Sequence, residues 1–282
     1  MHEDITGLKS LFEYINGLRG IDFSLYRHAT VARKLDLRLD ETDTRSYTEY
    51  LAYLKSHPRE IDNLIKALTI KVSNFFRNPL VYELLHSRVL PALISEFGEL
   101  KVWSLGCASG EEPYSVAMML YELLRRERET FRVEILSTDV DPEVIKKAVE
   151  GEYPESELEE VKKKHLDAFF SEIPAADKHF PGHKRCYTVK DEIKSMVKFE
   201  CGDIAIKLKE QGTGRGVFHI ILCRNVLIYM NRALQQKICS YITDILDPNG
   251  YLIIGESETI PETSRNAFVQ LYPGVKIYKK NH

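Results

Sequence analysis

The segment Lys101–Tyr114, KVWSLGCASGEEPY, has the residue types of a site where a small molecule meets backbone atoms. We expect a short apolar strand, then a turn of small residues, then a helix that opens with Glu111 and Glu112. Small residues let a ligand approach the chain closely, and the first turn of a helix offers unpaired N–H groups. The two carboxylates would repel a phosphate, which helix N-termini otherwise attract. The segment therefore predicts a ligand with positive charge or many hydroxyl groups, although a plain strand–turn–helix with an acidic first turn explains the same residues.

Two common nucleotide-binding motifs do not match this segment. No lysine follows Gly110, as a Walker-type loop requires, and Gly106 and Gly110 do not have the G-x-G-x-x-G spacing of dinucleotide sites. S-adenosylmethionine carries a sulfonium, an amino group and a ribose, so it suits an acidic, lysine-free turn better.

Polar residues follow the next two predicted strands. Asp139 ends the strand Val133–Thr138, and Asp203 and Ile204 come shortly after Val197–Cys201. Ligands of open α/β sheets bind outside the carboxyl ends of the strands. There Asp139 can accept the hydroxyl hydrogens of a ribose, while Asp203 binds an adenine amino group and Ile204 flanks the ring. A loop turn explains the second pair of residues equally well.

Three further residues at the same edge could take part in a reaction. Asn225 and Tyr229 follow the predicted strand Phe218–Cys223, at the position that faces the reactive atom of a ligand in such sheets. Asn225 offers a donor and an acceptor, and Tyr229 offers a phenol. Arg77 lies in the connection between the helical part and the sheet, and its fixed cation can orient a carboxylate. A packed aromatic and a solvated arginine are the alternative interpretations of Tyr229 and Arg77.

A basic stripe is predicted on the helical stretch 25–39. Arg27, Lys34 and Arg38 fall on one side of a helical wheel, and the apolar residues fall roughly opposite. The stripe is either a solvated face or a docking surface for an acidic partner.

The elements that position these residues fall into two groups. Residues 1–90 show apolar positions at helical spacing, and from Lys101 short β-rich runs alternate with helices. This alternation predicts a parallel sheet covered by helices on both faces. A polar stretch at 151–196 interrupts it and is expected to form a helix and a small β-hairpin. We expect a helical domain at 1–90 and a sheet domain at 91–282 that carries this insertion.

Composition excludes several classes of protein. The net charge is −3, which does not favour non-specific nucleic-acid binding. The five cysteines lack C-x-x-C spacing, which favours reduced thiols without zinc, and the isolated His179 and His183 are read as loop residues. No apolar run reaches the roughly 18 residues of a membrane span, and the acidic start is unlike a secretory signal. A cytoplasmic protein without direct membrane insertion is expected.

In its motifs and their order, the chain resembles the CheR-type chemotaxis protein methyltransferases. The resemblance covers nearly the whole chain, and its motifs are Phe75-Phe76-Arg77, Gly106–Ser115 with its GEEPYS core, Thr138–Asp141 and Cys223–Tyr229. It implies a class I S-adenosylmethionine-dependent (Rossmann-like) sheet domain, an all-helical N-terminal domain and a small inserted β-subdomain.

The resemblance also implies a set of site residues. Besides Glu112 for the methionine moiety, Asp139 for the ribose and Asp203 with Ile204 for the adenine, the cofactor site takes in Ser73, Arg77, Gly106, Asn225 and Val226. Arg77 and Tyr229 are the candidate catalytic residues. Ser73 keeps the hydroxyl of a family threonine, whereas Lys71 replaces a family asparagine and is not carried over.

The implied reaction is methyl transfer from S-adenosylmethionine to glutamate carboxylates in the cytoplasmic domain of chemoreceptors, with S-adenosylhomocysteine as product and no metal. Arg27, Lys34 and Arg38 would then dock the receptor. The enzyme would act as a monomer beside membrane receptor arrays. The insertion has only Gly182 where tether-binding members have a glycine-rich loop, so the chain resembles members that work without a tether. A methyltransferase for another acceptor and a non-enzymatic cofactor-sensing regulator are the alternatives.

Overall fold

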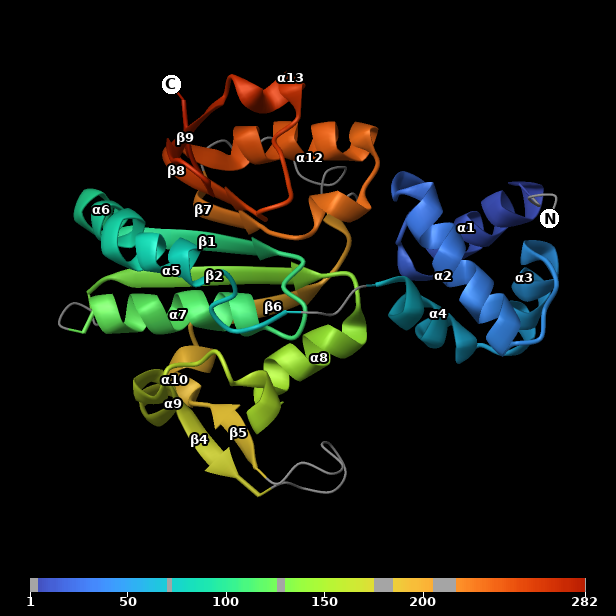
Figure 1. Ribbon diagram of the computed structural model, residues 1–282, viewed down its shortest axis with the longest axis horizontal. Coiled ribbons are helices and arrows are strands. Elements are labelled where there is room, and N and C mark those ends of the chain that lie inside the picture. The colour runs from blue at the N-terminus through green and yellow to red at the C-terminus, as the bar shows by residue number, and fades with distance from the viewer. Residues whose placement is uncertain (1–4, 70–72, 126–129, 175–184, 205–216, 282) are drawn as a thin grey trace.

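The computed structural model describes residues 5–69, 73–125, 130–174, 185–204 and 217–281. Figure 1 shows a helical unit on one side, a sheet with its helices on the other, and a smaller β-containing insertion below the sheet. The helical unit consists of α1 (Ile5–Arg19), the short 3-10 turn η1 (Phe23–Leu25), α2 (His28–Glu41), α3 (Tyr47–Ser56) and α4 (Glu60–Leu68). These helices enclose their own core, in which Leu11, Ile15, Leu35, Tyr50 and Leu64 are fully buried.

Within the described residues, the sheet domain has seven strands in the order β6-β2-β1-β7-β8-β10-β9. Five of them run parallel to one another: β6 (Val197–Cys201), β2 (Arg132–Asp139), β1 (Glu99–Leu105), β7 (Phe218–Cys223) and β8 (Leu246–Ile254). The last two, β10 (Val275–Lys280) and β9 (Phe268–Tyr272), are antiparallel. The predicted parallel sheet covered by helices is confirmed, with an antiparallel pair added at one edge. Residues 247–250 lie inside β8, next to a shift in the register of β8 against β7.

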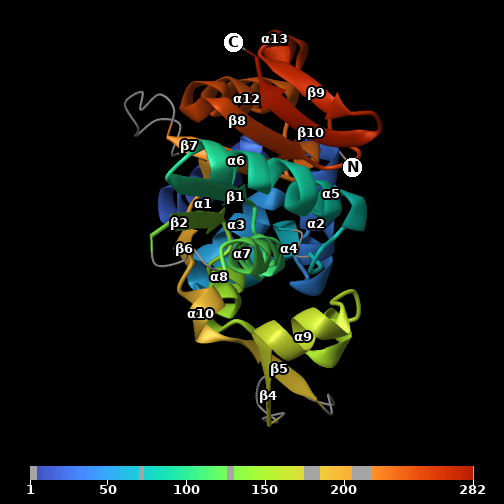
Figure 2. The same cartoon turned by 90° about the vertical axis from the view of Figure 1, so that its left-hand side faces the viewer.

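Alternate side chains of the strands build two cores on opposite faces of the sheet, as the period of two requires. In β1, Leu100 and Val102 pack into the core that includes α7 (Glu111–Leu123), whereas Trp103 and Leu105 pack into the core that includes α12 (Arg232–Ile245). The sheet domain also contains two shorter helices, α8 (Pro142–Glu150) after β2 and α13 (Glu262–Arg265) after β8. Figure 2 shows the helices on both sides of the sheet.

The helix after the Asn78-Pro79 start belongs to the sheet domain. It runs as α5 (Pro79–Leu84), a π-helical stretch η2 (Leu85–Val89) and α6 (Leu90–Glu96), and Pro91 is the second residue of α6. Its buried residues share the core of α7 and β1, while the core of the helical unit ends at Leu68. The structure therefore divides the two cores between Leu68 and Phe75, earlier than the boundary at residue 90 expected from the sequence.

The insertion is a small antiparallel sheet with flanking helices. Its strands β3 (Glu152–Pro154), β5 (Cys186–Val189) and β4 (Phe170–Ile173) pair in that order, and its helical elements are η3 (Glu155–Glu157), α9 (Lys163–Phe169) and α10 (Asp191–Lys194). The ring of Tyr153 contacts that of Phe75 edge to face, with centroids 4.9 Å apart. The insertion is thereby packed onto the core of the sheet domain.

Candidate active site

Two adjoining cavities open at the carboxyl ends of the parallel strands. The first, here called the strand-edge cavity, is lined by the ends of β2 and β6 and by the helical unit. The second, here called the Arg77 cavity, is lined by the segment Ser73–Arg77 and by the start of α7. Both cavities share Gly106, Asn225 and Tyr229. Every residue that the sequence assigned to the cofactor or the acceptor lines one of them: Ser73, Arg77, Gly106, Glu112, Asp139, Asp203, Ile204, Asn225, Val226 and Tyr229. Their individual roles remain predictions.

Gly106 lies where the two cavities meet, and it has no room for a side chain. Its φ of +68° is in the left-handed region, and an added Cβ would lie 2.4 Å from Cγ2 of Val226. Glycine alone accepts both conditions without strain. A ligand can therefore lie close to the backbone at this point.

The Asp139 carboxylate is held in one orientation at the end of β2. Its Oδ2 accepts a hydrogen bond from the N–H of Ala108 at 3.0 Å, and its Oδ1 accepts one from the N–H of Asp141 at 3.1 Å. Burial raises the pKa of Asp139, and these backbone donors oppose the shift. Asp141 has a structural role, because its carboxylate caps α8 by accepting from the N–H of Glu143 at 2.9 Å.

Glu112 is buried in the Arg77 cavity and has two protein partners. Its Oε1 accepts from the hydroxyl of Ser104 at 2.8 Å, and its Oε2 lies 3.2 Å from Nη1 of Arg224. Burial raises the pKa of Glu112, and the positive charge of Arg224 is the largest opposing influence. The carboxylate assigned to the methionine moiety is thus paired with a buried arginine.

Arg224 is a site residue for which no role was predicted from the sequence. The side chain is 3% exposed, and its Nη2 donates to the carbonyl of Arg77 at 2.9 Å and to Oδ1 of Asn78 at 2.6 Å. Asn78 has a φ of +63°, so the chain makes a sharp turn immediately after Arg77. Arg224 therefore fixes the segment that carries Arg77 to the end of β7. The sequence signal that could have indicated this role is the position of Arg224, directly before Asn225 at the end of a predicted strand.

Glu258 is a second residue that sequence reasoning missed. Its Oε2 accepts from the N–H groups of Asn225 at 2.8 Å and Gly255 at 2.6 Å, and its Oε1 accepts from the N–H of Ile228 at 3.1 Å. Asn225 has a φ of +59°, a conformation that is unfavourable for most residues. The buried carboxylate thus holds the turn that presents Asn225 and Tyr229 to the cavities.

Arg77 and Tyr229 face the Arg77 cavity from different elements. Burial raises the pKa of Tyr229, and Arg77 is the first influence that lowers it, so the two side chains are electrostatic neighbours. The phenol therefore stays neutral near pH 7 and can donate a hydrogen bond, and the guanidinium offers several N–H donors. This pair can orient a carboxylate.

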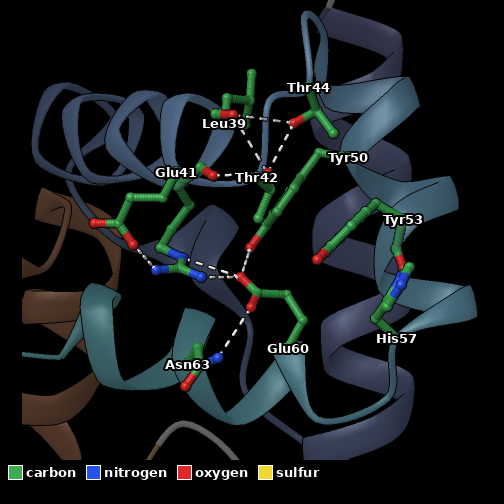
Figure 3. A network of polar contacts seen from close by, with 10 residues as sticks. Leu39, Glu41, Thr42, Thr44, Tyr50, Tyr53, His57, Glu60 and Asn63 are labelled. Atoms are coloured by element: carbon green, nitrogen blue, oxygen red, sulfur yellow. Dashed lines mark hydrogen bonds and ion pairs between the residues drawn. The ribbon is translucent and has the colours of Figure 1, made fainter.

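The basic stripe of α2 does not face solvent as a whole, which corrects the prediction of three exposed docking cations. Lys34 Nζ donates to the carbonyls of Leu68 at 3.0 Å and Thr69 at 3.1 Å, at the end of α4. Arg38 donates a hydrogen bond to the Glu60 carboxylate. This carboxylate also accepts from Tyr50 at 2.9 Å and from Asn63 at 3.0 Å, as Figure 3 shows.

The reason for this difference is that α2 packs against α4, so its polar side becomes an internal contact of the helical unit. Of the three cations, only Arg27 is exposed. Its backbone N–H donates to the carbonyl of Tyr229 at 2.8 Å, which places Arg27 beside the candidate acceptor site.

Among the described residues, no group of three or more His, Cys, Asp or Glu side chains is arranged to hold a metal ion. Lys71, His179 and His183 lie outside those residues. No helix in the described ranges is long and apolar enough to cross a membrane.

The donor set of the two cavities fits S-adenosylmethionine. Carboxylates of Asp139, Asp203 and Glu112 can accept hydrogen bonds from hydroxyl and amino groups, and Ile204 and Val226 supply apolar walls. Gly106, where a ligand can lie close to the backbone, is shared by the cavity that contains Asp139 and Asp203 and the cavity that contains Glu112.

Comparisons with known proteins agree with this geometry. Curated relatives described as chemotaxis protein methyltransferases come from Listeria innocua, 33% identical over 242 residues (86% of this chain, 85% of the relative), and Borreliella burgdorferi, 30% identical over 281 residues (97% and 94%). The relative from Escherichia coli is 31% identical over 250 residues, covering 87% of this chain and 82% of its own. The family model "CheR methyltransferase, all-alpha domain" matches residues 6–69, and "CheR methyltransferase, SAM binding domain" matches 71–273. The chain therefore belongs to the CheR methyltransferase family.

Proposed function

We propose that this protein transfers a methyl group from S-adenosylmethionine to glutamate side-chain carboxylates of chemoreceptors, giving methyl esters that serve sensory adaptation. Membership in the CheR family supports methylation in chemotaxis. The observation that carries the choice of a carboxylate acceptor is the pairing of Arg77 and Tyr229, a fixed cation and a neutral phenol, in one cavity beside the cofactor residues.

Residues of both cavities would hold the cofactor. Asp139 would bind the ribose, Asp203 with Ile204 would bind the adenine, and Glu112 would face the methionine moiety. Asn225 with Val226, at the junction of the cavities, and Ser73, in the Arg77 cavity, would complete the site.

When bound, S-adenosylmethionine supplies an electrophilic methyl group on a positively charged sulfur. A glutamate carboxylate is ionised at neutral pH, so the protein needs no strong general base. Arg77 and Tyr229 would hold the carboxylate so that one oxygen points at the methyl group, and such positioning can remove several kcal/mol of a barrier. Charges are neutralised as the reaction proceeds, so a site that excludes water favours the transition state. An overly tight Arg77 contact would stabilise the starting anion as well.

The direct test is incubation with methyl-labelled S-adenosylmethionine and cytoplasmic fragments of chemoreceptors from the same organism. Glutamate methyl esters are labile to mild alkali, so the label should be released by base. Tyr229→Phe and Arg77→Ala should lower the methylation rate much more than the affinity for S-adenosylhomocysteine, and Tyr272→Phe on the edge strand β9 is the matched control.

Other outcomes would identify the alternatives. An alkali-stable methyl product on another acceptor would indicate a different methyltransferase. Tight product binding without turnover on any receptor fragment would indicate a cofactor-sensing regulator. Unchanged turnover in both Tyr229→Phe and Arg77→Ala would remove the proposed catalytic roles.

Receptor docking is proposed at Arg27, the exposed cation of the original stripe. Arg27→Glu should weaken receptor recognition and leave S-adenosylhomocysteine affinity unchanged. Charge reversal at Lys34 or Arg38 should instead destabilise the helical unit, because these side chains bond to α4. In this proposal the enzyme works in the cytoplasm as a monomer, next to membrane receptor arrays.

A further inference from the structure

The helical unit forms one wall of the strand-edge cavity. Its contributions are Tyr26, Thr30 and Val31 from the start of α2 and the loop before it, and Leu68 and Thr69 from the end of α4. The opposite wall comes from the strand ends, with Asp139, Asp203 and Ile204. A ligand in this cavity therefore contacts both domains.

Tyr26 is attached to the sheet domain by backbone hydrogen bonds on both sides. Tyr26 and Met230 form an isolated antiparallel β-bridge. The N–H of Arg27 donates to the carbonyl of Tyr229 at 2.8 Å, and the N–H of Asn231 donates to the carbonyl of Leu25 at 2.9 Å. The segment before α2 is thus fixed to the turn that carries the candidate catalytic tyrosine.

The Tyr26 ring is held in place and its phenol lies near both strand-end carboxylates. The ring packs on Phe23, with centroids 5.2 Å apart. Burial raises the pKa of Tyr26, and the negative charges of Asp203 and Asp139 are the next largest causes, so the phenol stays protonated beside them. Tyr26 is half-buried and lines the strand-edge cavity, so its hydroxyl can reach a ligand that lies there.

We propose that Tyr26 is a further cofactor-binding residue, whose hydroxyl bonds to the nucleoside of the cofactor between Asp139 and Asp203. This inference rests on the proposed function, because it takes S-adenosylmethionine or its product as the ligand of the cavity. The helical unit then takes part in cofactor binding as well as in receptor docking.

Coupling between the two domains follows from this placement. Arg27 and His28 come directly after Tyr26 in the chain, and α2 begins there. A ligand that bonds to both Tyr26 and the strand ends favours the arrangement in which Arg27 lies against Tyr229. By linkage, a partner that binds this arrangement more tightly strengthens cofactor binding by the same factor by which the cofactor strengthens binding of the partner.

Calorimetric titration with S-adenosylhomocysteine tests the contact. Tyr26→Phe removes one oxygen and keeps the ring on Phe23, so the fold should be retained. Loss of one neutral hydrogen bond should weaken binding about three- to ten-fold. Tyr53→Phe in α3 makes the same chemical change away from both cavities and should bind like the unaltered protein. Analogues of S-adenosylhomocysteine that lack one ribose hydroxyl or one adenine ring nitrogen should identify the atom that bonds to Tyr26. The analogue that lacks this atom should bind equally well to Tyr26→Phe and to the unaltered protein.

Hydrogen exchange of backbone amides tests the coupling. S-adenosylhomocysteine should slow exchange at the N–H groups of Arg27 and Asn231, and this protection should be smaller in Tyr26→Phe than in Tyr53→Phe at equal ligand occupancy.

The outcomes separate this inference from the proposed function. Equal affinity of Tyr26→Phe and the unaltered protein would overturn the role of Tyr26 while leaving the cofactor site intact. No binding by the unaltered protein would overturn both. Weaker binding without any change in exchange at Arg27 and Asn231 would overturn the coupling.

Discussion

Replacing Arg224 by methionine should strongly destabilise the sheet domain. The guanidinium is 3% exposed and contacts the Glu112 carboxylate at 3.2 Å, the Arg77 carbonyl at 2.9 Å and Oδ1 of Asn78 at 2.6 Å. Methionine fills a similar volume but leaves the Glu112 carboxylate buried without its counter-charge. Removal of one partner of a buried ion pair costs about 3–5 kcal/mol, and we expect a loss of this order.

The loss should depend on pH in a defined direction. Burial already raises the pKa of Glu112, and Arg224 is the largest influence that lowers it. Without Arg224 the pKa of Glu112 in the folded state should rise further above its unfolded value. A raised carboxyl pKa contributes stability that is fully present below the unfolded pKa and is lost as the pH rises through the folded pKa. Arg224→Met should therefore be closer to the unaltered protein at pH 5 than at pH 8.

A double-mutant cycle with Glu112→Gln measures the coupling. Trp103 is the only tryptophan of the chain and is 1% exposed in the sheet core, so its fluorescence during urea unfolding reports this domain. Each single variant leaves one buried charge uncompensated, whereas the double variant leaves none. The double variant should therefore be more stable than the sum of the single losses predicts, by at least about 1 kcal/mol. Additive losses, or an Arg224→Met variant within about 1 kcal/mol of the unaltered protein at pH 8, would refute the role assigned to this pair.

Three further predictions concern single residues around the cavities. Burial raises the pKa of Glu111 to about 7. Urea unfolding should therefore show the free energy of unfolding falling by about 2–3 kcal/mol between pH 5 and pH 8, and a Glu111→Gln variant with the same dependence on pH would contradict this. Glu258→Gln should cost about 1–3 kcal/mol and weaken S-adenosylhomocysteine binding in calorimetry, because an amide can accept with only one of the two oxygens that hold the turn. Gly106→Ala should lower the urea midpoint and the affinity, and Val226→Ala in the same chain should restore part of both, since Cγ2 of Val226 is the atom that the new Cβ meets at 2.4 Å.

Local signals in the sequence accounted for most of the fold and for the positions of the candidate site residues. Apolar runs with β-forming residues marked the five parallel strands, and polar residues directly after them marked the edge where the cavities lie. This works because the carboxyl ends of parallel strands meet at one edge of the sheet, so a residue's place along its own strand decides where it lies. The resemblance to the CheR family added Ser73, Gly106 and Val226, for which spacing alone gave little indication.

Sequence patterns were less informative about which polar faces meet. The stripe of α2 was recognised as basic, yet Lys34 bonds to the carbonyl of Leu68, 34 residues away, so the face is internal. The boundary at residue 90 was misplaced for a related reason: the helical pattern at 79–96 is local, but its partner is the sheet.

By itself, the sequence determined the order of elements, the class of sheet and the residues at the strand ends, since these depend on neighbours a few positions apart. Only the tertiary structure decided how those residues are supported. Arg224 reaches Glu112 across 112 residues of chain, and Glu258 reaches Asn225 across 33. Buried charges and backbone N–H groups must find partners on folding, and those partners are chosen by proximity in space, which no local pattern records.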